Sequence, residues 1–205
     1  MTFEEAWAPV AALSASPREK LERLWQEAVD VIARGVHGDF AEFGVWRGAS
    51  AWILANACRG TGRRLHLYDT FTGIPASAVT VHDSHPAGDF ADTNLDQVKR
   101  LLSEFGGAIR FQVGEFAPET VPDNPLALVH IDCDVYHSYE LALPRFWSIL
   151  SPGGLLVLDD YGVPTCPGAT LATEEWLMRA DPIPDQVLAF PGPAGNWGAI
   201  IRRAL

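Results

Sequence analysis

The sequence predicts an α/β fold, a single doubly wound Rossmann-like sheet of about seven strands with helices on both faces. Short runs of Val, Leu and Ile alternate with segments of helical periodicity, which is typical of strand–helix units that build a parallel sheet. Near the end of the chain, 186–190 and 197–202 are extended segments joined by Pro, Gly and Asn, which predicts a hairpin. The sheet should therefore be mostly parallel, with an antiparallel C-terminal strand.

The N-terminal region divides into an arm and a helix. Residues 1–15 carry weak signals, whereas Ser16-Pro17-Arg18-Glu19 is a capping box that predicts a helix start, and Gly35 predicts its end. We therefore expect residues 1–35 to form an arm and helix that act as a cap or an oligomer contact. Residues 36–205 are expected to form the main domain.

The main domain alternates strands with helices. Strands are predicted at 39–44, 65–69, 109–113, 126–131 and 155–158, and helices at 49–57, 93–105, 139–150 and 169–179. Pro144 should kink its helix, because proline lacks the N–H and clashes with the preceding turn. The irregular stretch 70–91 has the length of a lid or of a disordered segment.

Composition narrows the function classes. The 205 residues fit one domain, and the net charge of −11 argues against nucleic acid or an anionic membrane as the main partner. The three cysteines show no CxxC spacing, which favours a reduced, cytoplasmic setting. Neither a leader nor a membrane span is expected.

Two acidic clusters follow predicted buried strands. Asp132 and Asp134 come after 126–131, and Asp159 and Asp160 come after 155–158. If these strands are neighbours, their carboxyl ends bring the carboxylates together, where they would repel one another. Mg²⁺ would resolve the repulsion, with Asp132, Asp159 and Asp160 as its ligands. The alternative for the Asp159-Asp160 pair is helix capping. Asp134 is expected either to support the metal ligands without binding the ion or to have a structural role.

The turn after the first strand, Glu42 to Ser50, lies where such sheets bind cofactors. Gly44 would let the backbone approach a ligand, and Ser50 is placed to donate from the helix start. The turn is not GxGxxG, and Glu42 would repel a pyrophosphate but attract a sulfonium ion. Asp69, which ends the second strand, is suited to a ribose hydroxyl pair. The alternative is a tight turn with a surface aspartate.

Two further segments are candidates for the rim of the site. Gly114 and Phe116, after the third strand, would contact adenine, although Phe116 is equally well explained as a core residue. His82 and His85 in the predicted lid would line an acceptor pocket, with a solvated loop as the alternative.

Four blocks of this chain, taken in order, resemble the macrocin O-methyltransferase family of class I S-adenosylmethionine-dependent enzymes. The blocks are AEFGVWRGAS at 41–50, DTFTGIP at 69–75, IDCDVY at 131–136, and LSPGG at 150–154 leading to DDYG at 159–162. The resemblance covers about 38–203. It implies a Mg²⁺-dependent sugar O-methyltransferase of glycosylated natural products. Its metal ligands would be Asp132, Asp159 and Asp160, and its cofactor residues Glu42, Gly44, Ser50 and Asp69.

Two departures from the family pattern concern the acceptor. Members of the family usually have additional N-terminal helices that help to cover the acceptor, and the N-terminal region of this sequence is short by comparison. Cys133 replaces the glycine commonly found between the two aspartates.

The expected reaction is an in-line displacement at the methyl group of S-adenosylmethionine. A cation that activates the hydroxyl favours a vicinal diol as the small-molecule acceptor. Proton removal falls to Asp132 or His137, although His137 is also explained as a surface residue at a helix start. The alternatives are a nicotinamide-dependent oxidoreductase and a non-catalytic S-adenosylmethionine-binding module. A homo-oligomer is compatible with the sequence, but no pattern requires it.

Overall fold

The computed structural model describes residues 1–192 and 195–205, and its centre is one seven-stranded sheet in the order β3-β2-β1-β4-β5-β7-β6. The strands are β1 (Asp39–Phe43), β2 (Leu65–Asp69), β3 (Ile109–Val113), β4 (Leu126–Ile131), β5 (Leu150–Leu158), β6 (Gln186–Gly192) and β7 (Gly195–Arg202). Strands β3, β2, β1, β4 and β5 are parallel, and β7 pairs antiparallel with both β5 and β6. The predicted fold class is therefore confirmed.

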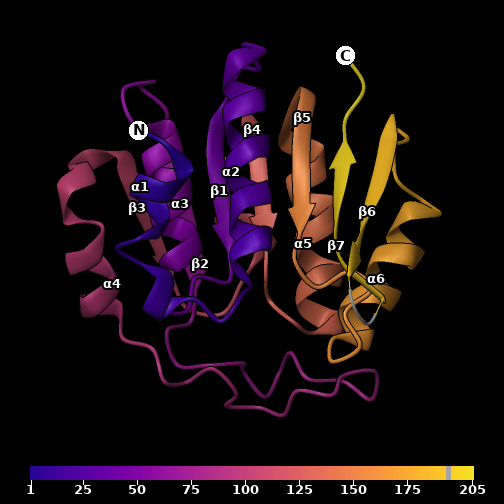
Figure 1. Cartoon of the computed structure of the whole chain (residues 1–205). Coiled ribbons are helices and arrows are strands. Elements are labelled where there is room, and N and C mark those ends of the chain that lie inside the picture. The colour runs from indigo at the N-terminus through magenta and orange to yellow at the C-terminus, as the bar shows by residue number, and fades with distance from the viewer. Residues whose placement is uncertain (193–194) are drawn as a thin grey trace.

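Helices cover both faces of the sheet (Figure 1). They are α1 (Phe3–Trp7), α2 (Arg18–Ala33), α3 (Ala49–Cys58), α4 (Leu95–Leu101), α5 (Tyr136–Ile149) and α6 (Pro167–Leu177), with 3-10 turns at Ala11–Leu13, Ser103–Ala108 and Pro118–Thr120. Helices α1 to α4 pack with one core and α5 and α6 with the other. Strand β4 supplies Leu128 to the first core and Val129 to the second, which is why all of its residues except His130 are apolar.

Several predicted boundaries need correction. The helix predicted at 93–105 is shorter, because α4 ends at Leu101 and a 3-10 turn follows. Strand β5 starts five residues before the predicted 155, and α5 starts three residues before the predicted 139 and runs through Pro144 as one element. The N-terminal arm forms α1, which has a complete capping box between Thr2 and Glu5.

Helix α2 begins with a different cap from the predicted one. Pro17 occupies the N-cap position and no side chain caps the helix. The Ser16 hydroxyl instead lies 3.4 Å from Asp159 Oδ2, at the end of β5. The capping-box prediction was therefore wrong, and Ser16 contacts an acidic cluster far away in the sequence.

The carboxyl ends of the parallel strands lie at one edge of the sheet, and the long connection from β2 to α4 passes along this edge (Figure 1). The chain reverses its direction of winding between β1 and β4, so this edge contains the crevice where doubly wound folds bind ligands.

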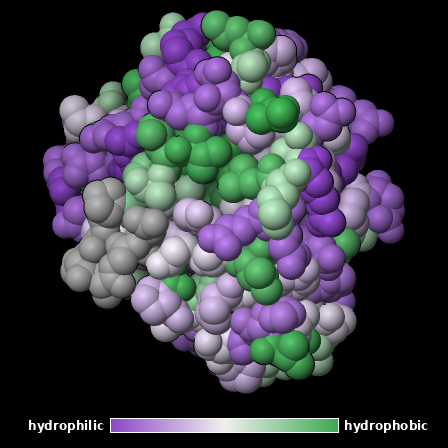
Figure 2. All heavy atoms as spheres, turned by 90° about the vertical axis from the view of Figure 1, so that its right-hand side faces the viewer, coloured by the Kyte–Doolittle hydropathy of each residue, from purple (hydrophilic) through white to green (hydrophobic). Residues whose placement is uncertain are grey.

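Strand β6 is the outer strand on the side of the sheet away from β3. Hydrophobic and polar side chains are mixed on this side of the molecule (Figure 2), and Val187 and Leu188 of β6 are exposed. Residues 193 and 194 of the predicted turn lie outside the described residues. None of the helices in the described part of the chain is long and apolar enough to cross a membrane.

Candidate active site

A cavity of about 350 Å³ lies at the carboxyl edge of the sheet. It is bordered by the segment before α2, the ends of β1, β2, β4 and β5, and the connection from β2 to α4. The cavity brings together most of the residues that the sequence singled out: Gly44, Ser50, Asp69, Phe116, Asp132, His137, Asp159 and Asp160. Its volume is in the range typical of small-molecule sites.

The two acidic clusters converge as expected, because β4 and β5 are neighbours. Oxygen atoms of Asp132, Asp134 and Asp160 lie within 4.8 Å of one another, and Asp132 forms a similar group with Asp159 and His130. Asp134 thus lies within the cluster, closer to Asp132 and Asp160 than the two roles expected from the sequence, a support for the metal ligands or a structural residue, require. Among the described residues, nothing donates a hydrogen bond to the Asp132 carboxylate.

The electrostatics of the cluster reflect crowding of negative charge. Burial, reinforced by the charges of neighbouring aspartates, raises the pKa of Asp132 and Asp134 well above the ordinary range. The pKa of Asp160 is raised for the same reasons. Without a further cation, this part of the cavity favours protonated carboxyl groups.

Asp159 behaves differently from its neighbours. Burial opposes its ionisation, but His130 and Lys20 outweigh burial and lower its pKa. Lys20 Nζ lies 2.7 Å from Asp159 Oδ2 and 2.8 Å from the Asp159 main-chain oxygen. The Lys20 contact occupies one oxygen of Asp159 and leaves Oδ1, which lies 3.9 Å from His130 Nε2.

Positive and negative side chains alternate from Lys20 through Asp159 and His130 to Glu42 of strand β1. His130 Nδ1 lies 2.9 Å from Glu42 Oε1, and both side chains are buried. Burial alone would lower the pKa of His130, but Asp159 and Glu42 raise it to about 10. The protonated imidazole therefore links two carboxylates. Glu42 does not line the cavity, so a contact between Glu42 and a cofactor stays a prediction.

Asp160 is fixed by two donors. Its Oδ2 accepts from the Asp134 main-chain N–H (2.9 Å) and from the Tyr139 hydroxyl (3.0 Å). No helix of the described chain begins at Asp159 or Asp160, so helix capping does not explain the pair. These contacts leave Oδ1 of Asp160 available to a ligand.

Gly44 is required by a close approach within the protein. A Cβ at this position would lie 1.7 Å from the Asp132 main-chain oxygen, and Gly44 has a φ of +90°. The glycine therefore lets the turn after β1 pack against the end of β4. Gly44 also lines the cavity, so a contact between its backbone and a cofactor stays a prediction.

Asp69 organises the turn after β1. Its Oδ2 accepts from the main-chain N–H groups of Val45 (2.6 Å) and Trp46 (2.8 Å), and its Oδ1 accepts from Phe71 (2.6 Å). Trp46 and Phe71 have left-handed backbones, which these hydrogen bonds help to hold. Asp69 also lines the cavity, and carboxylate oxygens can accept more than one hydrogen bond, so a ribose contact stays a prediction.

Aromatic rings form the wall near β3. Phe116 stacks on Phe43 with ring centroids 4.5 Å apart, and it lines the cavity while packing against the core. Both interpretations of Phe116 thus apply at once. Gly114 does not line the cavity. His137 does, with its Nδ1 3.0 Å from Glu140 Oε2.

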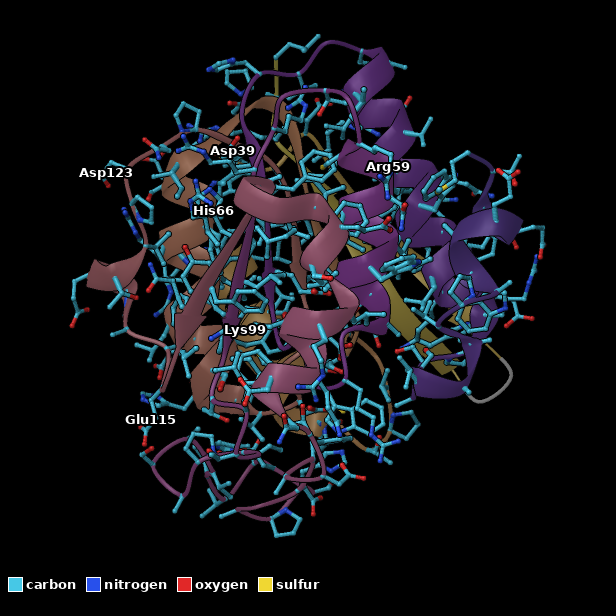
Figure 3. The ribbon with its side chains drawn as sticks, turned by 90° about the vertical axis from the view of Figure 1, so that its left-hand side faces the viewer. Asp39, Arg59, His66, Lys99, Glu115 and Asp123 are labelled. Carbon is cyan, nitrogen blue, oxygen red and sulfur yellow. The ribbon has the colours of Figure 1, made fainter. Side chains whose placement is uncertain are left out.

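The connection from β2 to α4 is anchored at both sides of the cavity. Ser77 Oγ donates to Glu115 Oε2 (2.6 Å), and Glu115 lies at the end of the sheet opposite Asp39 and His66 (Figure 3). On the other side, Asp83 Oδ1 accepts from the Tyr136 N–H (2.7 Å) at the start of α5. The connection is an ordered cover.

Of the two predicted loop histidines, only His85 lines the cavity. His82 is exposed and does not line it. The expectation of a solvated residue therefore holds for His82.

Sequence reasoning missed Lys20 and His130. Both are distant in sequence from the residues that they contact, and neither belongs to a recognisable local pattern. The sequence gave one weak signal for His130. It is a polar residue inside a fully buried strand, and such a residue needs a hydrogen-bond partner.

The donor set fits a divalent metal such as Mg²⁺. The side chains offer several carboxylate oxygens and few competing donors, and the raised pKa values show a shortage of positive charge. Lys20 forms an ion pair with Asp159, and its charge does not prevent the pKa of Asp132, Asp134 and Asp160 from being raised. Asp132 and Asp160 would hold the ion with Asp134 in the same group, whereas Asp159 lies in the group with Asp132 and His130, so its place in the ligand set stays a prediction.

The sheet order and the cavity define a class I methyltransferase-like Rossmann fold. The solved O-methyltransferase NovP is similar to this chain with a TM-score of 0.77 and 25% identity, covering 92% of this chain and 81% of NovP. The calicheamicin methyltransferase CalS11 is similar in fold, with a TM-score of 0.70 at 21% identity, over 98% of this chain and 91% of CalS11.

The profile of the macrocin O-methyltransferase (TylF) family matches residues 4–181. The chain belongs to this family. A relative from Streptomyces olivaceus, 8-demethyl-8-(2,3-dimethoxy-alpha-L-rhamnosyl)-tetracenomycin-C 4'-O-methyltransferase, is 32% identical over 163 residues, 72% of this chain. The match spans 62% of that relative's length. Mycinamicin III 3''-O-methyltransferase from Micromonospora griseorubida is 29% identical, over 77% of this chain and 68% of the relative.

Proposed function

We propose that this protein is an S-adenosylmethionine-dependent, Mg²⁺-dependent O-methyltransferase that acts on a hydroxyl of a vicinal diol, in a sugar of a glycosylated natural product. The observation that carries the proposal is a cavity that contains the turn after β1 together with Asp132, Asp159 and Asp160, in which Asp132 lies within 4.8 Å of Asp159 in one group of side chains and of Asp160 in another. Family membership supports the reaction class.

The cofactor half of the cavity is built by the ends of β1 and β2. S-adenosylmethionine, when bound, supplies an electrophilic methyl group. Asp69 fixes the turn through three main-chain N–H groups and offers its remaining lone pairs toward the cavity. Ser50 lies at the first turn of α3, and Phe116 offers an aromatic face.

The metal half is built by the ends of β4 and β5. Mg²⁺, when bound, lowers the pKa of a hydroxyl and orients it. Lys20 and His130 keep Asp159 ionised, so that this carboxylate is ready for a cation. Tyr139 and the Asp134 N–H hold Asp160 in place.

Proton removal has two candidate residues at the cavity, Asp132 and His137. Asp132 is the weaker base if it binds the cation. His137 is partly exposed and is paired with Glu140. A comparison of kcat in Asp132→Asn and His137→Gln decides between them.

The substrate class is supported by the relatives. The Streptomyces olivaceus relative is named for a 4'-hydroxyl of a rhamnosyl-tetracenomycin, and the Micromonospora relative for a 3''-hydroxyl of mycinamicin III. We therefore propose a deoxysugar attached to an aglycone as the acceptor. The apolar lining residues Ile74, Phe90 and Val163 offer contacts to such a molecule.

The test is a methylation assay with a panel of glycosylated aglycones and free diols. S-adenosylhomocysteine and methylated product are measured by mass spectrometry. Turnover should disappear with EDTA and return with Mg²⁺. Full turnover after exhaustive chelation would remove the metal from the account. Cofactor binding without Mg²⁺ binding and without turnover on the panel would favour a non-catalytic binding module.

A further inference from the structure

A second group of potential metal ligands lies beside the aspartate cluster. His85 belongs to the connection from β2 to α4, Asp134 follows β4, and Cys166 precedes α6. One ligand atom from each lies within 4.8 Å of the others. Cys166 Sγ is 3.7 Å from Asp134 Oδ1, and His85 Nε2 is 4.0 Å from the same oxygen. Imidazole, thiol and carboxylate together suit Zn²⁺ and similar ions, whereas Mg²⁺ prefers oxygen alone.

His85 is oriented as metal-binding histidines usually are. Its Nδ1 lies 2.9 Å from Asp89 Oδ2, and the ring packs against Phe90 with centroids 5.4 Å apart. When Nδ1 carries the proton and donates it to Asp89, Nε2 presents its lone pair to Asp134 and Cys166. A carboxylate that fixes the tautomer in this way is the common second contact of a ligating histidine.

The other two ligands are also held in place. Cys166 is 3% exposed, and its thiol contacts Asp134. Asp134 has a left-handed backbone, with a φ of 64°, and its N–H is bound by Asp160. A left-handed aspartate is tolerated but uncommon, so the surrounding contacts hold Asp134 in this orientation. All three ligands line the cavity, which leaves room for a solvent molecule as the fourth ligand.

We propose that His85, Asp134 and Cys166 form a second divalent-metal site, selective for Zn²⁺-like ions that accept nitrogen and sulfur ligands. The site joins three segments that are far apart in sequence and ties the cover of the cavity to its floor. Burial raises the pKa of the Cys166 thiol, so the metal must displace this proton to solvent when the metal–sulfur bond forms. The site does not depend on methyl transfer.

The test is a Co²⁺ titration of the full chain, without cofactor or acceptor, followed by absorption spectroscopy. A thiolate ligand gives a charge-transfer band in the near ultraviolet, which oxygen ligands do not. We expect one equivalent of Co²⁺ to produce this band and Zn²⁺ to remove it by displacement. An excess of Mg²⁺ should leave it in place.

Variants assign the ligands. Cys166→Ser should abolish the band, and His85→Gln should weaken Co²⁺ binding by about tenfold or more. Cys58→Ser is the matched control, because Cys58 is also buried but does not line the cavity, and it should keep the band. Asp132→Asn should also keep it, which separates this site from the Mg²⁺ cluster. If Cys166→Ser does not fold, as judged by circular dichroism, His85→Gln in the exposed connection still decides the question.

Two results would overturn the proposal. One is a folded wild-type protein without a charge-transfer band at saturating Co²⁺. The other is a band that survives both Cys166→Ser and His85→Gln but is lost in Cys133→Ser, which would place the metal on a different thiol. Neither result bears on methylation, so the proposed function stands or falls separately.

Discussion

The two halves of the cavity solve the burial of carboxylates in opposite ways. At the end of β2, Asp69 is satisfied by three main-chain N–H groups. At the ends of β4 and β5, Asp132 has no donor among the described residues, and the pKa of Asp132 and Asp134 is raised by burial and by like charges. In the first half, the hydrogen-bond donors that the carboxylate needs come from the protein itself. The second half lacks positive charge and is completed by a cation under our proposal.

This contrast distinguishes carboxylates that stabilise the fold from carboxylates that serve the proposed function. A carboxylate that is fully hydrogen-bonded contributes to folding, whereas crowded carboxylates oppose it. At Asp159, Lys20 and His130 outweigh burial and lower the pKa, whereas the pKa of Asp132, Asp134 and Asp160 stays raised. Substitutions in the two halves should therefore move stability and activity in different directions.

The largest effect is expected where the halves meet, at Gly44. Gly44→Ala places a Cβ 1.7 Å from the Asp132 main-chain oxygen, so the turn and the strand end must separate. We expect the free energy of unfolding to fall by more than about 4 kcal/mol, measured by urea denaturation. Gly60→Ala is the matched control, because Gly60 also has a positive φ but no atom within 4 Å of its Cβ position. Equal losses in both variants would show that backbone strain alone is responsible.

Asp132→Asn tests the acidic half. Under the proposed function, kcat/KM should fall about 1000-fold, equivalent to about 4 kcal/mol of transition-state stabilisation. In EDTA the variant should be at least as stable as the wild type, because the substitution removes a carboxyl whose ionisation is opposed by burial and like charges. A large loss of stability would mean that Asp132 is structural.

Asp69→Ala tests the satisfied half. It leaves three main-chain N–H groups without their acceptor, and two of the affected residues have left-handed backbones. We expect a loss of about 3 kcal/mol in the free energy of unfolding. The control is Asp123→Ala, whose side chain is mostly exposed and pairs only at the surface. If Asp69→Ala unfolds as the wild type does, Asp69 does not stabilise the fold, and the contrast between the two halves is wrong.

Lys20→Met tests whether the ion pair with Asp159 stabilises the acidic half of the cavity. It removes the cation that pairs with Asp159, and both side chains are largely buried. In EDTA the stability should fall by about 2 kcal/mol, and Mg²⁺ should restore more of it than it adds to the wild type. Thermal unfolding with and without Mg²⁺ measures this. Arg18→Met on the same helix removes exposed ion pairs and a cation–π contact with Phe3, none of which involves Asp159, and it should respond to Mg²⁺ as the wild type does.

The sequence was sufficient for the parts of the molecule that depend on periodicity and strand ends. It predicted the sheet, the hairpin at its border, and the approach of the two acidic clusters at the ends of β4 and β5. These follow from local patterns, because parallel strands present their carboxyl ends at one edge.

The sequence was insufficient where a side chain acts through a distant contact. Ser16 was predicted to cap α2 but contacts Asp159, and the close approach of Gly44 to the Asp132 main-chain oxygen was not predicted. Lys20 is one of many charged residues on an amphipathic helix, and nothing local marks it as the partner of Asp159. Such roles depend on how helix α2 packs across the sheet.

The most direct test of the account is a calorimetric titration of Mg²⁺ into the protein saturated with S-adenosylhomocysteine. The account predicts one saturable Mg²⁺ site in the wild type, and its loss in Asp132→Asn and Asp160→Asn variants that still bind the cofactor. Cofactor binding without any Mg²⁺ binding, or Mg²⁺ binding unchanged by both substitutions, would contradict it.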